Sequence, residues 1–213
     1  MIKKLLLIFF CVNSLLSFGQ TEKEQKLKQL SGVTSIKEAV DLLSSDTTLK
    51  GQVYSVNQLK DTSNLHSLFF LRKEGDIDVF YDAEIENKFA VKVLKKDSIL
   101  NYRVSYIFLD NSVYSKKAID SLRAIILKKI KKGESFNELA IKYSMDGNAK
   151  NGGDLWWFEE KQMIDVFEKE VKNHKKGDVY KVDVPEKKWS YIVKNTYEPV
   201  RSCKISIIYL PLP

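Results

Sequence analysis

The sequence predicts an α+β protein of two tandem units, in each of which helices pack on a small, mostly antiparallel sheet. The first observation is the order of elements in residues 101–198: a strand, two helices, a glycine loop, a short helix and two strands. The second is an internal repeat, because residues of the first half recur about 100 positions later. Together they predict one fold present twice.

The length and composition agree with a globular protein. A chain of 213 residues can hold one sizeable domain or two small ones, and 44% hydrophobic with 30% charged residues is typical of folded chains. The net charge of +7 is a mild excess, and the lysines are spread through both halves. Binding to nucleic acid is therefore not expected.

Residues 1–20 have the pattern of a secretory signal peptide. Lys3 and Lys4 form a basic start, Leu5–Val12 is an apolar run, and milder residues follow up to Gln20. The run is short for a membrane-spanning helix, although a retained membrane anchor stays open as an alternative. We expect an exported protein of the periplasm or cell envelope, peripheral to the membrane at most.

The cysteine and histidine content predicts neither a disulfide nor a metal site. Without residues 1–20 only Cys203 remains, and it has no partner for an intramolecular disulfide. His66 lies in an apolar run and His174 in a lysine-rich turn, so both are expected to be structural. These few ligand types are too dispersed in sequence to suggest a metal site, and no cofactor is expected.

The unit at residues 101–198 begins with a predicted strand, Arg103–Leu109. A long amphipathic helix follows and stops at Gly133. A second helix begins at the cap Ser135 and reaches about Tyr143. The apolar stripe of the long helix consists of Ile119, Leu122, Ile125, Ile126 and Ile130.

The rest of this unit follows a glycine loop. A short helix is expected around Met163–Val171. Strands Val179–Val184 and Trp189–Lys194 then close the unit, and Pro185 begins the turn between them.

The repeat defines a first unit at residues 22–100. Ser35 and Ser135 begin matching capping boxes 100 residues apart, and Gly75-Asp76 matches Gly177-Asp178 at an offset of 102. Because residues 1–20 occupy the place of an opening strand, this unit is expected to lack one.

A further strand is expected in the remaining C-terminal segment, residues 199–213. Its residues Ile205–Leu210 resemble Val104–Leu109 at an offset of 101. The strand either completes the sheet of the first unit or begins a third unit that is missing. We favour the former, because an unpaired apolar strand promotes aggregation.

The stretch 151–158 is the most informative part of the sequence. Two adjacent glycines permit a backbone path that other residues rarely adopt, and a short apolar segment follows at once. Met163 and Phe167 are four positions apart, so on a helix they would share one face. Leu155, Met163 and Phe167 are therefore expected to converge on one apolar pocket.

This block resembles the parvulin family of peptidyl-prolyl cis-trans isomerases. The family pattern runs roughly Y-S-x-D, a few residues, G-G-D-L-G-W-F, then Q-M and F-E. The chain carries it as Tyr143-Ser144-Met145-Asp146, Gly152-Gly153-Asp154-Leu155-Trp156-Trp157-Phe158, Gln162-Met163 and Phe167-Glu168.

The resemblance implies a role for each matching residue. Leu155, Met163 and Phe167 would form the slot for a proline ring, and Asp146 falls at the family's active-site Asp/Cys position. Trp156 stands where the family usually has glycine, so it would add bulk beside the slot as a further substrate-binding residue.

The chain departs from the family at two histidine positions. Tyr106 and Tyr191 occupy the places of two histidines that usually face each other under the pocket. Paired tyrosines can still form hydrogen bonds, but they differ from histidine in size and acidity. The first unit departs further, since Gln52 and Asp61 stand where Asp154 and Met163 do, and it is expected to be structural or a peptide-binding surface.

The resemblance implies a peptidyl-prolyl isomerase that assists the folding of exported proteins, with unfolded or proline-containing polypeptides as partners. Such an enzyme needs no nucleophile, only an apolar slot and a polar group that favours the twisted amide. One alternative is a non-catalytic chaperone or peptide-binding module on the same scaffold. Another is a structural tandem that assembles with an envelope protein.

Overall fold

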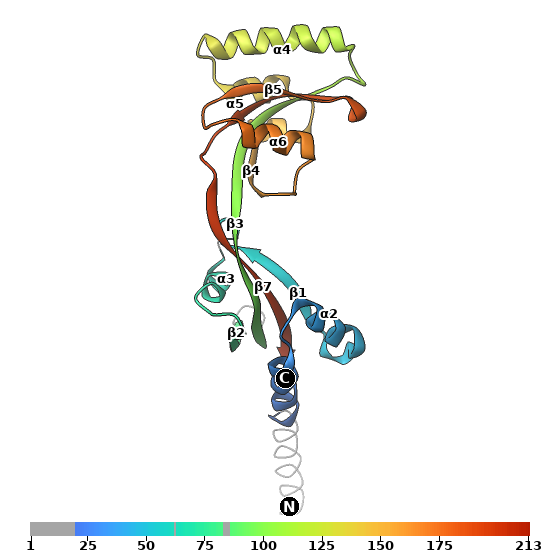
Figure 1. Cartoon of the computed structure of the whole chain (residues 1–213), viewed down its shortest axis with the longest axis vertical. Coiled ribbons are helices and arrows are strands. Elements are labelled where there is room, and N and C mark those ends of the chain that lie inside the picture. The colour runs from blue at the N-terminus through green and yellow to red at the C-terminus, as the bar shows by residue number, and fades with distance from the viewer. Residues whose placement is uncertain (1–19, 62, 83–85) are drawn as a thin grey trace, which may run out of the picture. The chain divides into compact units, whose positions relative to one another are not determined.

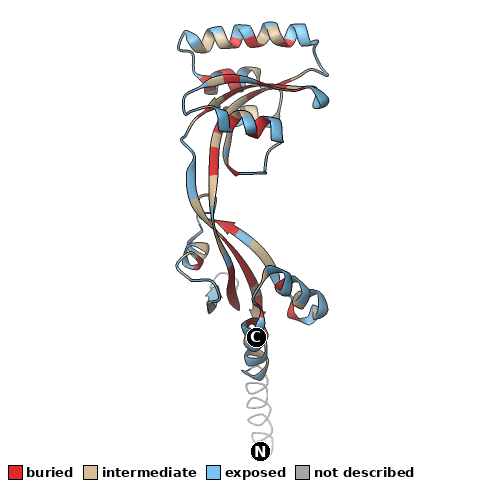
Figure 2. Ribbon diagram, in the orientation of Figure 1, coloured by how far each residue is buried: buried red, intermediate tan, exposed pale blue. Residues whose placement is uncertain are grey.

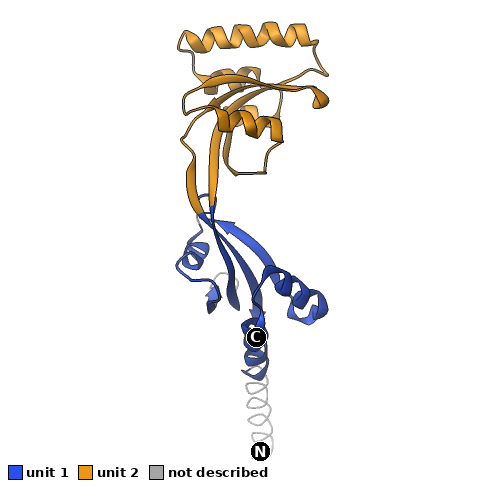
Figure 3. Ribbon diagram, in the orientation of Figure 1, with its two compact units in different colours: residues 1–98, 203–213 blue, residues 99–202 orange. Residues whose placement is uncertain are grey.

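The computed structural model describes residues 20–61, 63–82 and 86–213, and the chain divides into two compact units (Figures 1 and 3). Unit 1 comprises residues 1–98 and 203–213, and unit 2 comprises residues 99–202. Both are α+β, as expected. All but the last residue of the expected signal peptide lies outside the described residues.

Unit 2 is built on four antiparallel strands. They are the second part of β3 (Asn87–Asp110), β4 (Asp154–Glu159), β5 (Val179–Val184) and β6 (Trp189–Asn195). Strand β3 pairs with β4 and with β6, and β6 pairs in turn with β5, which gives the order β4-β3-β6-β5. Alternate residues of these strands face opposite sides of the sheet.

Helices cover both faces of this sheet (Figure 1). Helices α4 (Lys116–Lys131) and α5 (Phe136–Tyr143) pack on one face, where their apolar residues form a core with Ile107 and Ile192. Helix α6 (Asp165–Asn173) packs on the other face, against Val104 and Val193. We call these the α4/α5 face and the α6 face.

The predicted long helix of unit 2 is confirmed as α4. Ser115 caps it by accepting from the Ala118 amide, and Gly133 follows the helix with a φ of +92°. Ile119 and Ile126 are fully buried, whereas Ile125, expected in the apolar stripe, is 52% exposed. The stripe is therefore narrower than the sequence pattern indicates.

The strands of unit 1 lie in the order β1-β7-β3-β2, and β7 is antiparallel to β1 as β3 is to β2. The C-terminal strand pairs with β1 from Gln52↔Tyr209 to Asn57↔Lys204, so it lies in the sheet of unit 1. The elements of unit 1 are the helical residues 20–32, α2 (Ile36–Ser45), η1 (Thr47–Leu49), β1 (Gln52–Asn57), α3 (Asn64–Phe69), β2 (Ile77–Asp82), the first part of β3 and most of β7 (Val200–Leu212).

Burial explains why the C-terminal strand belongs to this unit (Figure 2). Ile205, Ile207, Ile208 and Leu210 are all fully buried. Ile205 and Ile207 join one apolar cluster of unit 1, while Ile208 and Leu210 join the cluster on its other face. The strand thus contributes to both halves of the unit 1 core, and residues 203–213 pack with a unit that begins far away in sequence.

Two short connections complete unit 2, η2 (Gly147–Asn151) and η3 (Pro185–Lys187). Strand β3 is much longer than the predicted Arg103–Leu109, because its first part belongs to unit 1. The compact units also differ from the expected boundaries 22–100 and 101–198, since residues 203–213 group with the first. Within the described ranges, no helix is both long and apolar enough to cross a membrane.

Candidate functional site

Of the two adjacent glycines, Gly153 packs directly against strand β3. Gly152 and Gly153 have φ values of +66° and +78°, a region that side chains rarely adopt. A Cβ on Gly153 would lie 2.2 Å from the backbone oxygen of Tyr106. The Tyr106 amide donates to the Gly153 carbonyl at 2.9 Å. The glycine loop is therefore fixed to the residue that occupies the first histidine position.

Strand β4 contains an irregularity that turns its apolar residues to one face. Trp156 has a φ of +62°, and the pairing of β4 with β3 shifts register between Arg103 and Ser105. A bulge of this kind adds one residue to a strand and reverses the alternation of side chains beyond it. Leu155 and Phe158 consequently both contact the α6-face core, although they are three positions apart.

The side chain of Trp156 lies away from this core, contrary to its expected place beside the slot. It is 49% exposed, and the Arg103 guanidinium lies 4.0 Å from the centre of its ring. Arg103 is held there by Asp154, whose Oδ1 accepts from Nε at 3.1 Å. A cation–π contact thus accounts for Trp156, and it is not among the residues that pack on the α6 face.

Met163 lies in the turn before α6 and not on the helix, which corrects the expected span Met163–Val171. Two side-chain acceptors fix this turn: Gln162 Oε1 accepts from the Glu159 amide at 3.0 Å, and Glu168 Oε2 from the Lys161 amide at 2.8 Å. The turn brings Met163 against the same core as Phe167.

Three aromatic rings form a wall on the α6 face. The Tyr106 and Tyr191 rings meet edge to face, with centroids 5.7 Å apart. Phe167 is 4% exposed and lies 5.3 Å from Tyr191 and 6.3 Å from Tyr106, again at steep angles. Such tilted pairs are favourable arrangements for aromatic rings. Leu155 and Met163, both partly buried, pack against the same cluster.

Asp146 adds a carboxylate to this wall. The Tyr106 hydroxyl donates to Asp146 Oδ2 at 2.7 Å, and the Ser144 hydroxyl donates to Oδ1 at 2.9 Å. Ser144 also accepts from the Phe108 amide on β3. The sequence pattern contains Ser144, but its role as the link between Asp146 and the sheet depends on a strand 36 residues away and was not predicted.

Both tyrosines are protonated at neutral pH, and their environment makes ionisation still less favourable. Burial and the Asp146 carboxylate raise the pKa of Tyr106 well above its usual value. Burial, with a smaller contribution from Asp146, raises the pKa of Tyr191 to about 12. Both hydroxyls are therefore hydrogen-bond donors. The Tyr106 hydroxyl donates its hydrogen bond to Asp146, whereas the Tyr191 hydroxyl makes no hydrogen bond to another described residue.

The structure thus brings together six of the seven predicted site residues and separates one. Those gathered on the α6 face are Tyr106, Asp146, Leu155, Met163, Phe167 and Tyr191. Trp156 stands apart on Arg103. Among the described residues no group of three or more His, Cys, Asp or Glu side chains could hold a metal ion.

Comparison with known proteins identifies this region. The family model of the PPIC-type PPIASE domain matches residues 87–198. The foldase protein PrsA of Bacillus subtilis (strain 168) is 45% identical over 73 residues, which cover 33% of this chain and 24% of PrsA. The chaperone SurA of Vibrio vulnificus (strain YJ016) is 27% identical over 100 residues, 46% of this chain and 23% of SurA.

Among solved structures, the crystal structure of PrsA from Bacillus subtilis shares 35% sequence identity with this chain. That match covers 46% of this chain and 35% of PrsA, with a TM-score of 0.37. The chain spans about a quarter of the length of the curated relatives it matches. Since the family model covers more than half of its residues, the chain belongs to the parvulin family, that of the PPIC-type PPIASE domain.

Proposed function

We propose that unit 2 is a peptidyl-prolyl cis-trans isomerase that assists the folding of exported proteins. The observation that carries the proposal is the hydrogen bond of Tyr106 to Asp146 inside an aromatic wall that Leu155 and Met163 extend. Membership of the parvulin family supports the reaction class.

The chemistry requires no covalent step. Rotation about a peptide bond has a barrier of about 18–20 kcal/mol, because the C–N bond has partial double-bond character. In the twisted state that conjugation is lost, and charge moves back toward the nitrogen. A slot formed by Leu155, Met163 and Phe167 would hold the proline ring away from water, where a single hydrogen bond favours the twisted state more strongly.

The two tyrosines take different parts in this proposal. Tyr191, whose hydroxyl has no partner among the described residues, donates to the substrate amide. Tyr106 is a positioning residue, because its proton already binds Asp146 and its ring packs against Tyr191. Asp146 in turn is oriented by Ser144.

The clients and the compartment belong to the proposal as well. PrsA is named a foldase and SurA a chaperone, and both share this region with the chain. Residues 1–20 have a signal-peptide pattern. We propose unfolded or proline-containing polypeptides as the partners, met in the periplasm or cell envelope.

We further propose that unit 1 is a degenerate second copy, with its opening strand supplied by the C-terminus. The strand orders β1-β7-β3-β2 and β4-β3-β6-β5 correspond one to one. The cores correspond too: on one face of unit 1, the positions of Val193, Phe158, Val171, Val104 and Tyr102 are taken by Val91, Val56, Phe69, Ile207 and Ile205.

The matching site in unit 1 has lost its polar and apolar parts. Asp61, at the position of Met163, is hydrogen-bonded to the His66 ring. Asp46, at the position of Asp146, caps η1 by accepting from the Thr48 amide at 3.1 Å, and no tyrosine of the described residues donates to it. Any isomerase activity is therefore assigned to unit 2.

A non-catalytic chaperone on the same scaffold is the second candidate. It is favoured by the tyrosines at the two histidine positions, since the Tyr191 ring packs against both Phe167 and Phe108. Under this alternative the apolar wall holds client segments without accelerating their isomerisation.

A protease-coupled assay on an alanyl-prolyl peptide separates the two candidates. The isomerase proposal predicts a rate above background for wild type and loss of that rate in the double variant Asp146→Ala, Met163→Ala. Lys181→Ala, an exposed position on β5, serves as the control and should keep the rate. A wild type without isomerisation that still suppresses aggregation of an unfolded client would favour the chaperone.

A further inference from the structure

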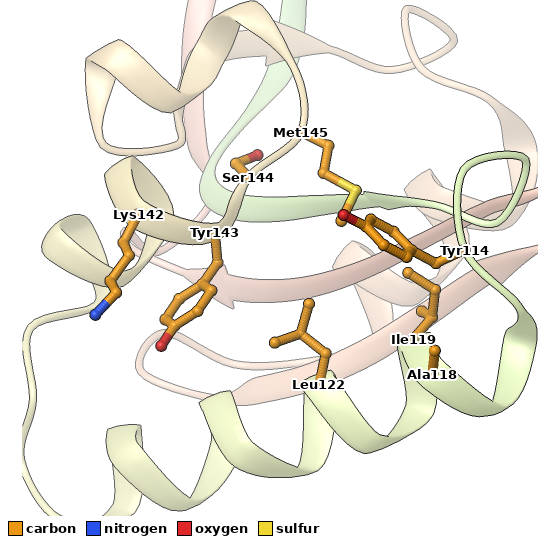
Figure 4. A pocket seen from close by; sticks show the side chains of 8 residues that line it. All are labelled: Tyr114, Ala118, Ile119, Leu122, Lys142, Tyr143, Ser144 and Met145. Carbon is orange, nitrogen blue, oxygen red and sulfur yellow. The ribbon is translucent and has the colours of Figure 1, made fainter.

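A pocket of about 450 Å³ lies on the α4/α5 side of unit 2, outside the aromatic wall (Figure 4). Its size falls within the roughly 300–1,000 Å³ of small-ligand sites. Its lining is apolar except for one ammonium and the hydroxyls: Tyr114, Ala118, Ile119, Leu122, Lys142, Tyr143, Ser144 and Met145.

The rim of this pocket exposes apolar side chains to water. Tyr114 is 53% exposed and its neighbour Val113 is 63% exposed, both in the loop that leads into α4. Single exposed apolar residues are common, but here two are consecutive and one of them, Tyr114, lines the pocket. The floor is formed by Ile119, which is fully buried, and by Leu122.

The pocket and the proposed isomerase site share one short segment. Ser144 and Met145 line the pocket, and the next residue, Asp146, accepts the hydrogen bond from Tyr106. Met145 is itself fixed, since its Sδ accepts from the Asp110 amide at 3.3 Å. The pocket and the proline site lie on opposite faces of the sheet, but they meet at Asp146, because Ser144 of the pocket lining donates to its Oδ1 at 2.9 Å. A client that passes Asp146 can therefore reach the pocket within a few residues of its proline, since an extended chain spans about 3.3–3.6 Å per residue.

We infer that this pocket binds a large apolar side chain of the same client, a few residues from the proline. The inference rests on the proposed function and deepens it, because it gives the isomerase a preference beyond the proline itself. The occupant follows from the lining and from continuity with the site through Ser144–Asp146. Lys142 is the one cationic residue of the lining, so an acidic neighbour of that apolar residue should strengthen binding.

The test compares fluorescent peptides with a single Ala-Pro and either leucine or serine at one position, scanned from two to five residues beyond the proline. Anisotropy gives the Kd of each peptide and the coupled assay gives kcat/KM. At the best position leucine should bind about tenfold tighter than serine, a gain expected for burial of one apolar side chain.

Two tryptophan substitutions on α4 form a matched pair. Ala118→Trp fills the pocket from an exposed position of the helix, whereas Ser121→Trp adds the same bulk at an exposed position outside the lining. Ala118→Trp should remove the leucine gain, and Ser121→Trp should keep it. Neither should alter the kcat/KM of the serine peptide.

The outcomes separate this inference from the proposed function. If the serine peptide is not isomerised, the proposed function fails while the leucine gain in Kd still tests the pocket. If leucine gives no gain at any position, or if Ala118→Trp leaves the gain intact, the pocket inference is overturned. It is also overturned if sedimentation shows a dimer that Ala118→Trp disperses, because a second copy then occupies the pocket.

Discussion

Tyr106 and Tyr191 determine how this site differs from one built on histidines. An imidazole exchanges donor and acceptor roles near neutral pH, whereas a phenol with a raised pKa stays a donor. Burial raises the pKa of both tyrosines, and in the case of Tyr106 the bonded Asp146 carboxylate adds to it. In place of two side chains that can exchange donor and acceptor roles, the site therefore has one fixed hydrogen-bond donor, which its neighbours orient.

A flat pH profile follows from this substitution. We expect the wild-type kcat/KM to change by less than about twofold between pH 6 and 8.5, because no histidine titrates in the site. Exchange NMR on a proline peptide measures this without a coupling protease. An inflection of kcat/KM within this pH range would contradict the assigned roles.

Alkaline pH should affect stability instead. The folded-state pKa of Tyr191, about 12, lies above its ordinary value. The stabilisation linked to the neutral phenol is therefore complete below about pH 10 and is lost as the pH rises toward the folded-state value. Urea unfolding at pH 9 and pH 11 should show a lower midpoint at the higher pH, with a smaller drop in Tyr191→Phe.

The backbone conformation of Trp156 lowers the stability of the fold, whereas its contact with Arg103 raises it. Its left-handed backbone costs about 1–2 kcal/mol relative to glycine, and its contact with Arg103 returns about 0.5–1 kcal/mol. Trp156→Gly should therefore change stability by less than about 1 kcal/mol. Urea unfolding followed by the emission of Trp157 and Trp189 measures this.

Activity gives the second half of that prediction. Because Trp156 lies outside the α6-face core, Trp156→Gly should keep kcat/KM near the wild-type value. A large loss of kcat/KM would indicate that Trp156 acts beside the proline slot, as the family resemblance implies.

At the scale of elements, the glycine loop is expected to tolerate little change at Gly153. Gly153→Ala combines an unfavourable φ with a Cβ that would lie 2.2 Å from the Tyr106 carbonyl. Gly133→Ala is the matched control, with a similar φ of +92° and nothing within 4 Å of its Cβ. We expect Gly133→Ala to lower the free energy of unfolding by about 1–2 kcal/mol, and Gly153→Ala to lower it by at least about 2 kcal/mol more.

Tryptophan emission suits this comparison, because all three tryptophans, residues 156, 157 and 189, lie in unit 2. Equal losses of unfolding free energy in the two variants would mean that the glycine loop moves to accommodate the added Cβ. Its contact with Tyr106 would then not position the site.

Local patterns predicted most elements of unit 2, and distant contacts account for the misses. The amphipathic stripe and the Ser135 cap are local signals, and α4 and α5 follow them. Met163 was expected on a helix, but the turn that carries it depends on the Glu168 side chain. The roles of Ser144 and Trp156 also depend on residues far away in sequence and could not be predicted.

At the scale of the whole molecule, the sequence indicated the proposed repeat and favoured the place of the C-terminal strand in unit 1, but it did not give the register of that strand. The capping boxes and the Gly-Asp pairs indicate two related units. The registers of β1 and β4 on their partners favour an offset of 103 for the opening strands, two residues more than the 101 suggested by sequence. A two-residue shift keeps the same faces, so apolar pattern alone cannot distinguish the two.

Because the C-terminal strand packs in unit 1, its deletion should affect unit 1 selectively. Deletion of residues 203–213 removes four fully buried residues from unit 1 and none from unit 2. Hydrogen exchange followed by mass spectrometry should show loss of protection in residues 22–98 and near wild-type protection in residues 103–195. Deletion of the exposed Pro213 alone is the control. Loss of protection throughout the chain would contradict the assignment of this strand to unit 1.

The central claim is that the tyrosine-based site of unit 2 isomerises X–Pro bonds. The most direct measurement is the exchange rate of a single Ala-Pro peptide by NMR at neutral pH, with wild type and with the folded double variant Asp146→Ala, Met163→Ala. Uncatalysed exchange takes tens to hundreds of seconds at 25 °C. We predict exchange well above this rate with wild type and the uncatalysed rate with the variant. Equal rates for peptide alone and peptide with wild type would contradict the claim.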